Sequence, residues 1–334
     1  MNRSVTSIDV ALLAGVSQSA VSRAFTPAAS VSDATRRKVF EAARKLGYRP
    51  NAIARTLITR RSRIIGVVVS YLDNQFYPVV LEELSKQLRQ HGYHLLLFCT
   101  DTQDTDELLA EILQYQVDGI VMASTTLSSG VARTCAEAGI PVVLFNRTAR
   151  PGPSSSVAAD NVDGGREVAR LLCAAGHQRI AFIAGLEDTS TSRDREKGFL
   201  AGLAEYGRRC FGRAVGHYQF DGAVRATLAL FAHNPHPDAV FVANDHMAIA
   251  VMDTLRQQLG MRVPEDVSVV GFDDVPQAAW GSYQLTTVRQ PANLMIEATV
   301  ALLIRQMDND QALREDIVLP AELVLRHSAR LPRA

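Results

Sequence analysis

The chain has 334 residues, of which 47% are apolar, 21% are charged and 6% are aromatic, and its formal net charge at pH 7 is zero. An apolar fraction near one half is typical of a folded globular protein and excludes a chain that is mainly disordered. The sequence has no apolar run near the roughly 18 residues of a membrane helix and no N-terminal signal segment, so we expect a cytoplasmic protein of two or three domains.

The zero net charge hides an uneven distribution of charge along the chain. Residues 1–63 carry twelve Lys and Arg against three acids, a net charge of +9. This leaves 23 basic and 32 acidic side chains in residues 64–334, a net charge of −9. A basic head on an acidic body is typical of a polyanion-binding module joined to a second domain. The alternative is a basic tail without a function, but the head also has the pattern of a folded domain.

Three short helices are predicted in the basic head, because each apolar periodic segment has its own start and stop signals. The N-capping residues are Thr6, Ser17 and Ser32, and the terminating glycines are Gly15 and Gly47. Asp9 completes a variant of the capping box with Thr6, and glycine readily adopts the positive φ that ends a helix. We expect helices at 7–14, 18–25 and 33–46. The residues expected to face inward on the third helix are Val39, Phe40, Ala43 and Leu46.

The short link Ala14-Gly15-Val16-Ser17 between the first two helices predicts a helix-turn-helix. In this motif the second helix lies in the DNA major groove, with the residues near its N-terminus against the base edges. We therefore expect DNA contacts from Gln18, Ser19, Ser22 and Arg23. Glutamine pairs with adenine and arginine with guanine through two hydrogen bonds each, and serine reaches phosphate or either base.

Two segments resemble the LacI/GalR family of bacterial repressors. Residues 9–23, from Asp9-Val10-Ala11 to Val21-Ser22-Arg23, resemble its helix-turn-helix, and residues 46–57, from Leu46-Gly47-Tyr48 to Arg55-Thr56-Leu57, resemble its hinge helix. The resemblance extends over the whole chain and implies a hinge helix at 50–58 that enters the minor groove. Apolar wedges of this kind unstack a base step and bend the duplex.

The resemblance also implies which hinge residues contact DNA. Leu57 is the expected wedge between the central base pairs, and Asn51, Ala54 and Arg55 are expected beside it. The alternative for Leu57 is a core leucine beneath the body.

Strands and helices alternate in the rest of the chain, which indicates parallel sheets with right-handed crossovers. Strands are expected at 64–70, 93–99, 119–123, 141–145, 179–184, 215–219, 238–242 and 267–271, and helices at 79–90, 106–114, 131–138, 164–175, 193–206, 222–232 and 246–259. Two such series indicate two similar lobes, and they resemble the periplasmic-binding-protein type I fold that the family joins to its head.

The expected fold class is therefore an all-α helix-turn-helix head joined by a hinge helix to an α/β body of two parallel-sheet lobes. The expected domains are 1–62, which binds DNA, and 63–334, which binds an effector and dimerises. The N-lobe is expected at about 63–160 plus 291–319, and the C-lobe at about 161–290 plus 320–334.

Polar residues follow several of the predicted strands, where ligands of open α/β sheets bind. Three of them lie in segments that resemble effector-binding elements of the family: Arg195 in Arg195-Glu196-Lys197-Gly198-Phe199, Asn244 in Val242-Ala243-Asn244-Asp245, and Asp273 in Gly271-Phe272-Asp273-Asp274. The resemblance implies that these three bind the effector. Asp163 is expected with them, and Phe76 and Phe220 are expected as aromatic walls.

Each of these residues also has a purely structural interpretation. Arg195 could pair with a neighbouring acid on the surface of a helix, Asn244 could cap the helix that follows it, and the two phenylalanines could be core residues. The family often has an aromatic ligand just after Val288-Arg289-Gln290, where this chain has Pro291-Ala292, so one wall of the pocket differs.

The sequence offers little support for an enzyme. It contains no G-x-S-x-G, H-E-x-x-H, Walker or G-x-G-x-x-G motif, its eight histidines do not cluster, and its four cysteines form no C-x-x-C pair. We therefore expect neither a cofactor nor a bound metal. A solute-binding protein, the other alternative, would need a signal peptide and would not need the basic head.

We expect a sequence-specific repressor that binds a palindromic operator in double-stranded DNA as a homodimer, because two half-sites require two readers. A small-molecule effector, a sugar or sugar acid, is expected between the lobes, and no membrane partner is expected. Whether the effector releases the protein from DNA or recruits it is left open. The absence of leucine heptads near residue 334 favours a dimer over a tetramer.

Overall fold

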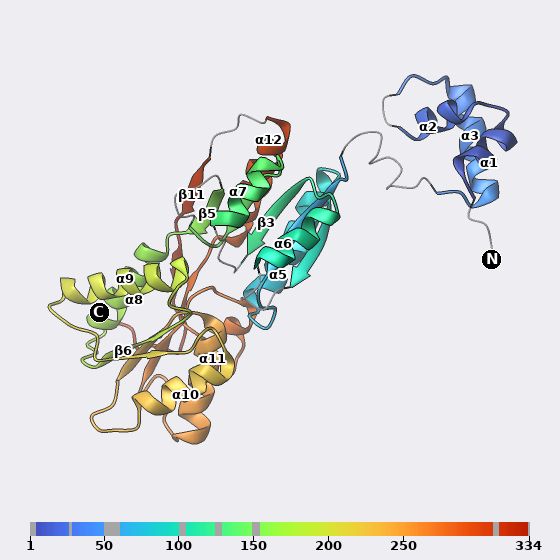
Figure 1. The fold of residues 1–334 in the computed structure, drawn as a ribbon. Helices are drawn as coiled ribbons and strands as arrows, with labels where there is room; N and C mark the ends of the chain where they lie inside the picture. Colours follow the sequence, from blue (N-terminus) through green and yellow to red (C-terminus); the bar gives the residue numbers. More distant parts are fainter. Residues whose placement is uncertain are drawn as a thin grey trace. The chain divides into compact units, whose positions relative to one another are not determined.

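The computed structural model of the chain describes residues 5–26, 29–49, 61–99, 105–123, 129–148, 154–309 and 314–332. Its contacts separate two units, a head of Met1–Ser62 and a body of Arg63–Ala334 (Figure 1). The hinge helix expected at 50–58 lies outside the described residues, as do Asn51, Ala54, Arg55 and Leu57. Within the described ranges, the helices all lack the length and apolarity that a membrane crossing requires.

The described part of the head forms three helices whose ends match the capping signals of the sequence. They are α1 (Ser7–Ala14), α2 (Gln18–Phe25) and α3 (Asp33–Leu46). Thr6 and Asp9 form the predicted capping box, in which the Thr6 backbone N–H donates to Asp9 Oδ2 at 2.8 Å. Gly15 and Gly47 have φ values of 64° and 65° and end α1 and α3. The predicted boundaries of these helices are therefore confirmed.

A small apolar core holds the three helices together. Its buried members include Val10, Val21, Ala24, Val39 and Ala43. The prediction that Phe40 faces inward is wrong, because this side chain is 45% exposed. Phe40 follows the buried Val39 by one residue, which turns it about 100° away around the helix. Its ring packs edge-on against Phe25 at the border of the core, with centroids 5.0 Å apart.

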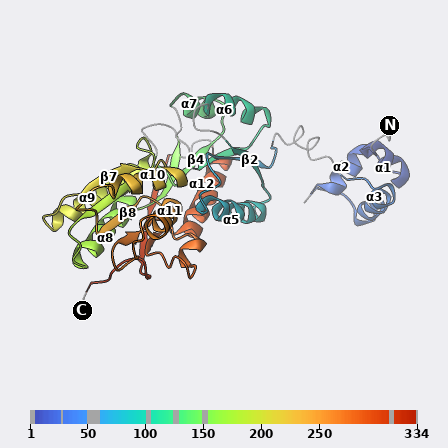
Figure 2. The same ribbon diagram turned by 90° about the horizontal axis from the view of Figure 1, so that it is seen from below.

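The first lobe of the body contains a parallel sheet with the strand order β11-β5-β4-β3-β1-β2. Its strands are β1 (Ile64–Val69), β2 (His94–Cys99), β3 (Gly119–Ala123), β4 (Val142–Phe145), β5 (Ser155–Ala159) and β11 (Asp316–Leu319). The helices that pack on it are α5 (Phe76–Gln90), α6 (Thr105–Gln114), α7 (Ser129–Glu137) and α12 (Ala292–Asp308). Figure 2 shows α5 and α12 on one face of this sheet and α6 and α7 on the other.

Both faces of this sheet are buried, as its runs of β-branched residues predict. In β1, Val67 and Val69 pack in one apolar cluster with Leu84 of α5. Val68, which lies between them in the strand, packs in a second cluster with Ile112 of α6. This alternation follows from the two-residue period of a strand.

The second lobe contains a parallel sheet with the order β7-β6-β8-β9. Its strands are β6 (Ile180–Ala184), β7 (Gly212–Val215), β8 (Ala239–Val242) and β9 (Ser268–Val270). Its helices are α8 (Asn161–Ala174), α9 (Ser190–Glu205), α10 (Phe220–Leu230) and α11 (Asp245–Asp253), the last continued by a π-helical turn, Thr254–Gln258. Two parallel sheets with helices against them confirm the predicted α/β body.

The chain passes between the lobes at three places. After β5 it enters α8 at Asn161, and after β10 (Thr287–Arg289) it returns to the first lobe at Ala292 in α12. After β11 it enters β12 (Glu322–Val324), which pairs antiparallel with β10. These two short strands form a connection beside the large sheets.

Several elements differ from the prediction. The strand expected at 215–219 is β7 at 212–215, a partly exposed edge strand without an apolar run. The strand β5 was not predicted, because its sequence, Ser-Ser-Val-Ala-Ala, follows a stretch rich in serine and proline and has little strand character. The elements α12, β10, β11 and β12 lie outside the predicted strands and helices.

Helices α8 and α9 pack closely because glycines line their contact. An ideal Cβ at Gly198 would lie 1.8 Å from the Val162 carbonyl oxygen, and one at Gly165 would lie 2.2 Å from the Arg195 carbonyl oxygen. Real atoms cannot approach this closely, so each position requires a residue without a side chain. The close contact fixes the first turns of α9, which carry Arg195.

Candidate functional site

One side of α2 presents polar side chains to solvent. Gln18, Ser19, Ser22 and Arg23 are all exposed, as a helix that reads DNA requires. The opposite side of α2 carries Val21 and Ala24, each 1% exposed, which anchor the helix in the head core. The helical period places the apolar and the polar side chains on different sides of α2, so the polar side chains are available to a partner.

Local hydrogen bonds orient two of these side chains. Arg23 Nε donates to the Ser19 carbonyl at 3.3 Å, which leaves the two terminal nitrogens for the paired hydrogen bonds that guanine accepts. Gln18 Nε2 donates to Ser7 Oγ at 3.0 Å, so this amide is tied to the start of α1. Ser17, the N-cap, accepts from the Ala20 N–H at 3.2 Å and fixes the first turn of α2.

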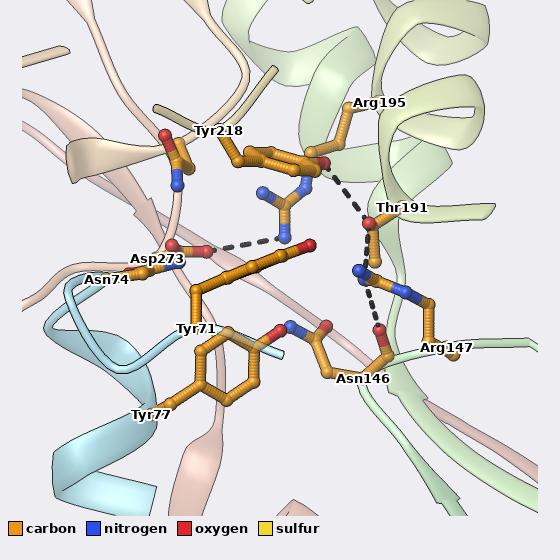
Figure 3. A pocket seen from close by; sticks show the side chains of 10 residues that line it. Tyr71, Asn74, Tyr77, Asn146, Arg147, Thr191, Arg195, Tyr218 and Asp273 are labelled. Atoms are coloured by element: carbon orange, nitrogen blue, oxygen red, sulfur yellow. Dashed lines mark hydrogen bonds and ion pairs between the residues drawn. The ribbon is translucent and has the colours of Figure 1, made fainter. Parts of the chain in front are cut away.

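A pocket between the two lobes is lined by polar and aromatic side chains (Figure 3). Its lining residues are Tyr71, Asn74, Tyr77, Asn146, Arg147, Thr191, Arg195, Tyr218, Asn244 and Asp273. The first five follow strands β1 and β4 of the first lobe, and the others belong to the second lobe. The residues therefore meet at the carboxyl ends of strands from both lobes, where ligands of such sheets bind.

Arg195 and Asp273 form a buried ion pair at one side of this pocket. Their side chains are 2% and 3% exposed, and Arg195 Nη2 lies 3.3 Å from Asp273 Oδ1. Arg195 Nε donates to Asn161 Oδ1 at 2.8 Å and Nη1 donates to the Ala243 carbonyl at 2.5 Å. The guanidinium carbon also lies 3.7 Å from the centroid of the Phe272 ring. The interpretation of Arg195 as a surface residue is therefore wrong.

Asp273 has further partners and an unusual backbone. Gln290 Nε2 donates to its Oδ1 at 2.7 Å, and the Asn74 side chain from the first lobe lies beside the carboxyl and favours its charged form. Burial raises the pKa of the Asp273 carboxyl, while the nearby Arg195 guanidinium opposes this rise. Its φ of 130° is in a region that residues with side chains rarely adopt.

The two polar atoms of the Asn244 side chain have different surroundings. Its Oδ1 accepts a hydrogen bond from the Met247 N–H at 3.0 Å and caps α11, as one interpretation of the sequence predicted. Its Nδ2 is buried and has no hydrogen-bond partner among the described residues. Asn146 Oδ1, on the first lobe, is likewise buried and without a partner in the described part of the chain. The pocket therefore holds an unused donor on Asn244 and an unused acceptor on Asn146.

Several hydrogen bonds connect the lobes around the pocket. Arg147 Nη1 donates to Thr191 Oγ1 at 2.7 Å, and the Thr148 N–H donates to Ser190 Oγ at 3.0 Å. At the other side, His246 Nδ1 of α11 lies 3.4 Å from Gln75 Oε1. These contacts join the loops that follow β1 and β4 to the N-termini of α9 and α11.

Tyr218 lies flat against Gly185 and forms one wall of the pocket. An ideal Cβ at position 185 would lie 2.1 Å from the Tyr218 ring, so the ring needs a glycine there. His217 and Tyr218 both have positive φ, 57° and 60°, and Asn146 has a φ of 55°. Three pocket residues, Asn146, Tyr218 and Asp273, thus have backbone conformations that cost free energy, and such residues cluster at functional sites.

Three residues expected in the site lie elsewhere. Asp163 is an exposed residue in the first turn of α8, where its N–H donates to Asp160 Oδ1. Phe220 is 40% exposed and its ring lies 6.1 Å from that of His246, outside the residues that line the pocket.

Phe76 is the third of these residues. It is buried against Phe145, with ring centroids 6.4 Å apart. It lines a second hollow, with a volume of about 360 Å³, that shares Asp273 with the pocket. Pro291 and Ala292, which stand where the family often has an aromatic residue, line the same hollow.

Most of the remaining pocket residues have a weaker signal in the sequence, which is their position after a predicted strand. Asn74, Tyr77, Asn146, Arg147 and Thr191 are among the residues that follow the strands expected at 64–70, 141–145 and 179–184. Tyr71 and Tyr218 were missed. Tyr71 is the second residue after β1, next to the polar Ser70, and this position after a strand was the available signal for a pocket residue. The described residues contain no group of three or more His, Cys, Asp or Glu side chains that could hold a metal ion.

Comparisons with known proteins match both units of the chain. A family model described as bacterial regulatory proteins, lacI family, matches residues 7–51. A second model, described as a periplasmic binding protein-like domain, matches residues 169–329. The first match covers the three-helix head, and the second covers most of the second lobe and the segments that return to the first.

Full-length relatives are found among proteins and solved structures. The chain is 35% identical over 329 residues to the HTH-type transcriptional regulator CelR of Thermobifida fusca, with 96% of each chain covered. A structure of a CelR–cellobiose complex aligns with a TM-score of 0.73 and 32% identity, covering 97% of this chain and 99% of that one. A lac repressor dimer bound to operator and the anti-inducer ONPF aligns with a TM-score of 0.87 and 28% identity, covering 98% and 99%.

Proposed function

The chain belongs to the lacI family of bacterial regulatory proteins, and from this premise we propose how its two units act together. It is a sequence-specific DNA-binding transcriptional regulator controlled by a small molecule. We propose that it is a cytoplasmic homodimer and assign it no catalytic activity. Gln18, Ser19, Ser22 and Arg23 would read the major groove, and Asn51, Ala54, Arg55 and Leu57 would contact the minor groove.

The observation that carries the proposed control is the position of the pocket between the lobes. Its buried polar residues come from both lobes, so a ligand bound there has different contacts when the lobes move. A ligand shifts a conformational equilibrium only through such a difference in affinity. We propose that effector binding changes the arrangement of the lobes and thereby the affinity of the head for DNA.

We propose a sugar as the effector, with Arg195, Asn244, Asp273 and Tyr218 among its ligands. A hydroxyl group can donate to Asn146 Oδ1 and accept from Asn244 Nδ2, which are both buried and without a hydrogen-bond partner among the described residues. The solved CelR complex contains cellobiose. A sugar acid is the second candidate, because Arg147 is a second arginine in the pocket and a carboxylate binds well to a guanidinium.

Operator selection followed by an effector screen tests this proposal. The full chain is incubated with a pool of random duplexes, and the selected operator is used to screen neutral sugars and sugar acids. We expect a palindromic operator and at least one compound that changes its affinity. The body alone, residues 63–334, should bind the same compound but not the operator. Operator binding by the body alone, or no response to any compound, would overturn the proposal.

Arg23→Ala should reduce operator affinity by about 1–3 kcal/mol and relax the preference at one base pair of each half-site. The reason is the loss of a guanidinium whose terminal nitrogens are available for two hydrogen bonds to guanine. Binding to operator variants with single base changes measures this effect. An equal loss for every sequence would instead identify Arg23 as a phosphate contact.

Leu57→Ala tests the wedge that the family resemblance implies. We expect specific binding to weaken about tenfold or more and the bend in the operator to decrease, because insertion of an apolar side chain bends the duplex and brings further contacts. Non-specific binding, which depends on phosphate contacts and salt, should remain. Gel shifts with circularly permuted operator fragments measure the bend, and an unchanged bend angle would show that Leu57 is not the wedge.

A further inference from the structure

The side chain of Tyr71 lies in the middle of the pocket between the lobes. Figure 3 shows its phenol crossing the pocket, with Asp273, Arg195 and Tyr218 on one side and Tyr77 and Asn146 on the other. Its ring meets that of Tyr77 edge-on, with centroids 6.4 Å apart. Tyr71 is partly buried and follows the last residue of β1 by two positions, in a loop without regular structure.

With Tyr71 in this position the pocket has almost no free space. Its volume is about 10 Å³, which is enough for about one water molecule. Pockets that hold small molecules typically measure about 300–1,000 Å³. A sugar ring therefore cannot enter until a side chain leaves or the lobes separate.

Three other side chains of the pocket are fixed by contacts within the second lobe. Arg195 has a hydrogen-bond partner or ion-pair partner at each of its three nitrogens. Asn244 caps α11, and Tyr218 lies flat on Gly185. Tyr71 belongs to a loop and its side chain lies at the centre of the pocket. We infer that its departure creates more space than that of any side chain at the pocket wall.

With Tyr71 in the pocket, two buried polar atoms of the pocket have no hydrogen bond to the described residues. The buried Asn146 Oδ1 and Asn244 Nδ2 have no hydrogen-bond partner in the described part of the chain. An unpaired buried polar atom costs free energy, because it has lost its hydrogen bonds to water. One phenol hydroxyl cannot serve groups on both sides of the pocket, whereas a ring with several hydroxyls can donate to one amide and accept from the other.

We propose that Tyr71 is an internal occupant of the effector pocket and that a hydroxylated six-membered ring displaces it. This inference rests on the proposed effector site and adds the residue that sets the affinity and ring size of the effector. The free energy of moving Tyr71 is subtracted from the free energy of ligand binding. Ligands that lack hydroxyls for the two asparagines do not compensate for that cost and are rejected.

Displacement of Tyr71 also changes contacts between the lobes. The loop that carries Tyr71 continues to Asn74, whose side chain lies beside Asp273, and to Gln75, whose Oε1 lies 3.4 Å from His246 Nδ1. Both partners belong to the second lobe. Movement of this loop therefore changes the connections between the lobes, which links occupation of the pocket to the arrangement of the body.

The first experiment tests the occupancy of the pocket without an effector. Tyr71→Ala in the full chain is compared with wild type and with Tyr206→Ala, whose side chain is 48% exposed on the surface. The probe is p-cresol, which has the shape of the tyrosine side chain. We expect p-cresol to raise the Tm of Tyr71→Ala by about 2 °C or more and to leave the other two proteins unchanged. An equal response of all three proteins would overturn the proposal.

The second experiment measures sugar binding by calorimetry. D-glucose, D-ribose and cellobiose are titrated into wild type, Tyr71→Ala and Tyr71→Phe. We expect the sugar that binds best to bind Tyr71→Ala at least tenfold more tightly than wild type, and we expect Tyr71→Phe, which keeps the ring, to lack this gain.

Weaker binding to Tyr71→Ala than to wild type would overturn the inference, because Tyr71 would then be a ligand contact. Equal binding to both would overturn the inference and leave the proposed sugar effector standing. Failure of every sugar to bind any of the three proteins, with the p-cresol response intact, would overturn the proposed sugar effector and with it the displacement by a sugar, but not the occupancy of the pocket by Tyr71.

Discussion

Arg195→Ala is expected to weaken the effector response by about a hundredfold while leaving operator affinity without effector nearly unchanged. The substitution removes a buried guanidinium that lines the pocket and pairs with Asp273 at 3.3 Å. A hydrogen bond to a charged group contributes about 1.5–3 kcal/mol, and 2.7 kcal/mol corresponds to about a hundredfold in affinity. The head does not contain Arg195, so its DNA contacts remain.

The same substitution should lower the free energy of unfolding by about 3–5 kcal/mol, because removal of one partner of a buried ion pair leaves the other charge unpaired. Asp273 then remains buried without its cation. Arg195→Ala combined with Asp273→Asn should be more stable than Arg195→Ala alone, because the unpaired carboxylate is gone. Urea unfolding of wild type, both single variants and the double variant measures this coupling.

The contribution of Asp273 to the free energy of unfolding should decrease as the pH rises. Burial raises the pKa of the Asp273 carboxyl above its value in the unfolded chain. The folded chain therefore binds a proton more tightly there, so this contribution to stability is full below the unfolded pKa and is lost as the pH rises through the folded pKa. Without Arg195, the charged form of Asp273 is even less stable relative to its protonated form. The destabilisation by Arg195→Ala should therefore be smaller at pH 5 than at pH 8.

Arg193→Ala is the matched control for these measurements. Arg193 lies on the same helix but is exposed, and its Nη1 donates to the Asp188 carbonyl. We expect wild-type effector response and stability to within about 0.5 kcal/mol. Operator affinity across an effector titration is the measurement. A wild-type response in folded Arg195→Ala would show that the effector binds elsewhere.

The three described helices of the head could be predicted almost completely from the sequence because their signals are local. A capping residue, an apolar period of 3.6 and a glycine that adopts positive φ lie within one short segment, and each helix boundary follows from them. Phe40 is the exception. Its apolar character suggested burial, but its exposure depends on how α3 is rotated against α1 and α2, which is a tertiary property.

The pocket was predictable only where a motif carried the residue. Arg195, Asn244 and Asp273 were assigned through the family resemblance, and the structure brings all three to the pocket. The choice of Phe220 as a wall followed from a strand expected at 215–219. The strand ends at Val215, and a turn with positive φ at His217 and Tyr218 follows it.

The turn after Val215 explains why Tyr218 was missed. Strand alternation predicts which way a side chain points only while the backbone stays extended. Tyr218 instead depends on a left-handed backbone and on the absence of a side chain at Gly185, 33 residues earlier in the sequence. The position of Tyr71 depends in the same way on the approach of the two lobes.

Gly198→Ala is expected to destabilise the body by about 3 kcal/mol or more. Elsewhere in a helix, alanine is more favourable than glycine by about 1 kcal/mol. Here the new Cβ would lie 1.8 Å from the Val162 carbonyl oxygen and 2.7 Å from its carbonyl carbon. These are backbone atoms of α8, so the clash is relieved only by moving the helices apart. Overpacking of this kind costs about 1–3 kcal/mol or more, which exceeds the gain in helix propensity.

Separation of α8 and α9 should also weaken effector binding. Arg195 lies on α9 and its Nε donates to Asn161 Oδ1 at the start of α8 at 2.8 Å. Movement of one helix away from the other stretches this bond and displaces the guanidinium from the pocket. We therefore expect the effector affinity of Gly198→Ala to fall even under conditions in which the body remains folded.

Gly207→Ala separates packing from backbone effects. Gly207 follows α9 with a φ of 63°, and a Cβ there would meet no atom within 4 Å. It should therefore cost only about 1 kcal/mol for the left-handed backbone and should leave effector affinity unchanged. Urea unfolding and calorimetry of both variants compare the two effects. If Gly198→Ala proved as stable as wild type, α8 and α9 could not be in the contact described, and the rigid support that this contact gives to Arg195 would have to come from elsewhere.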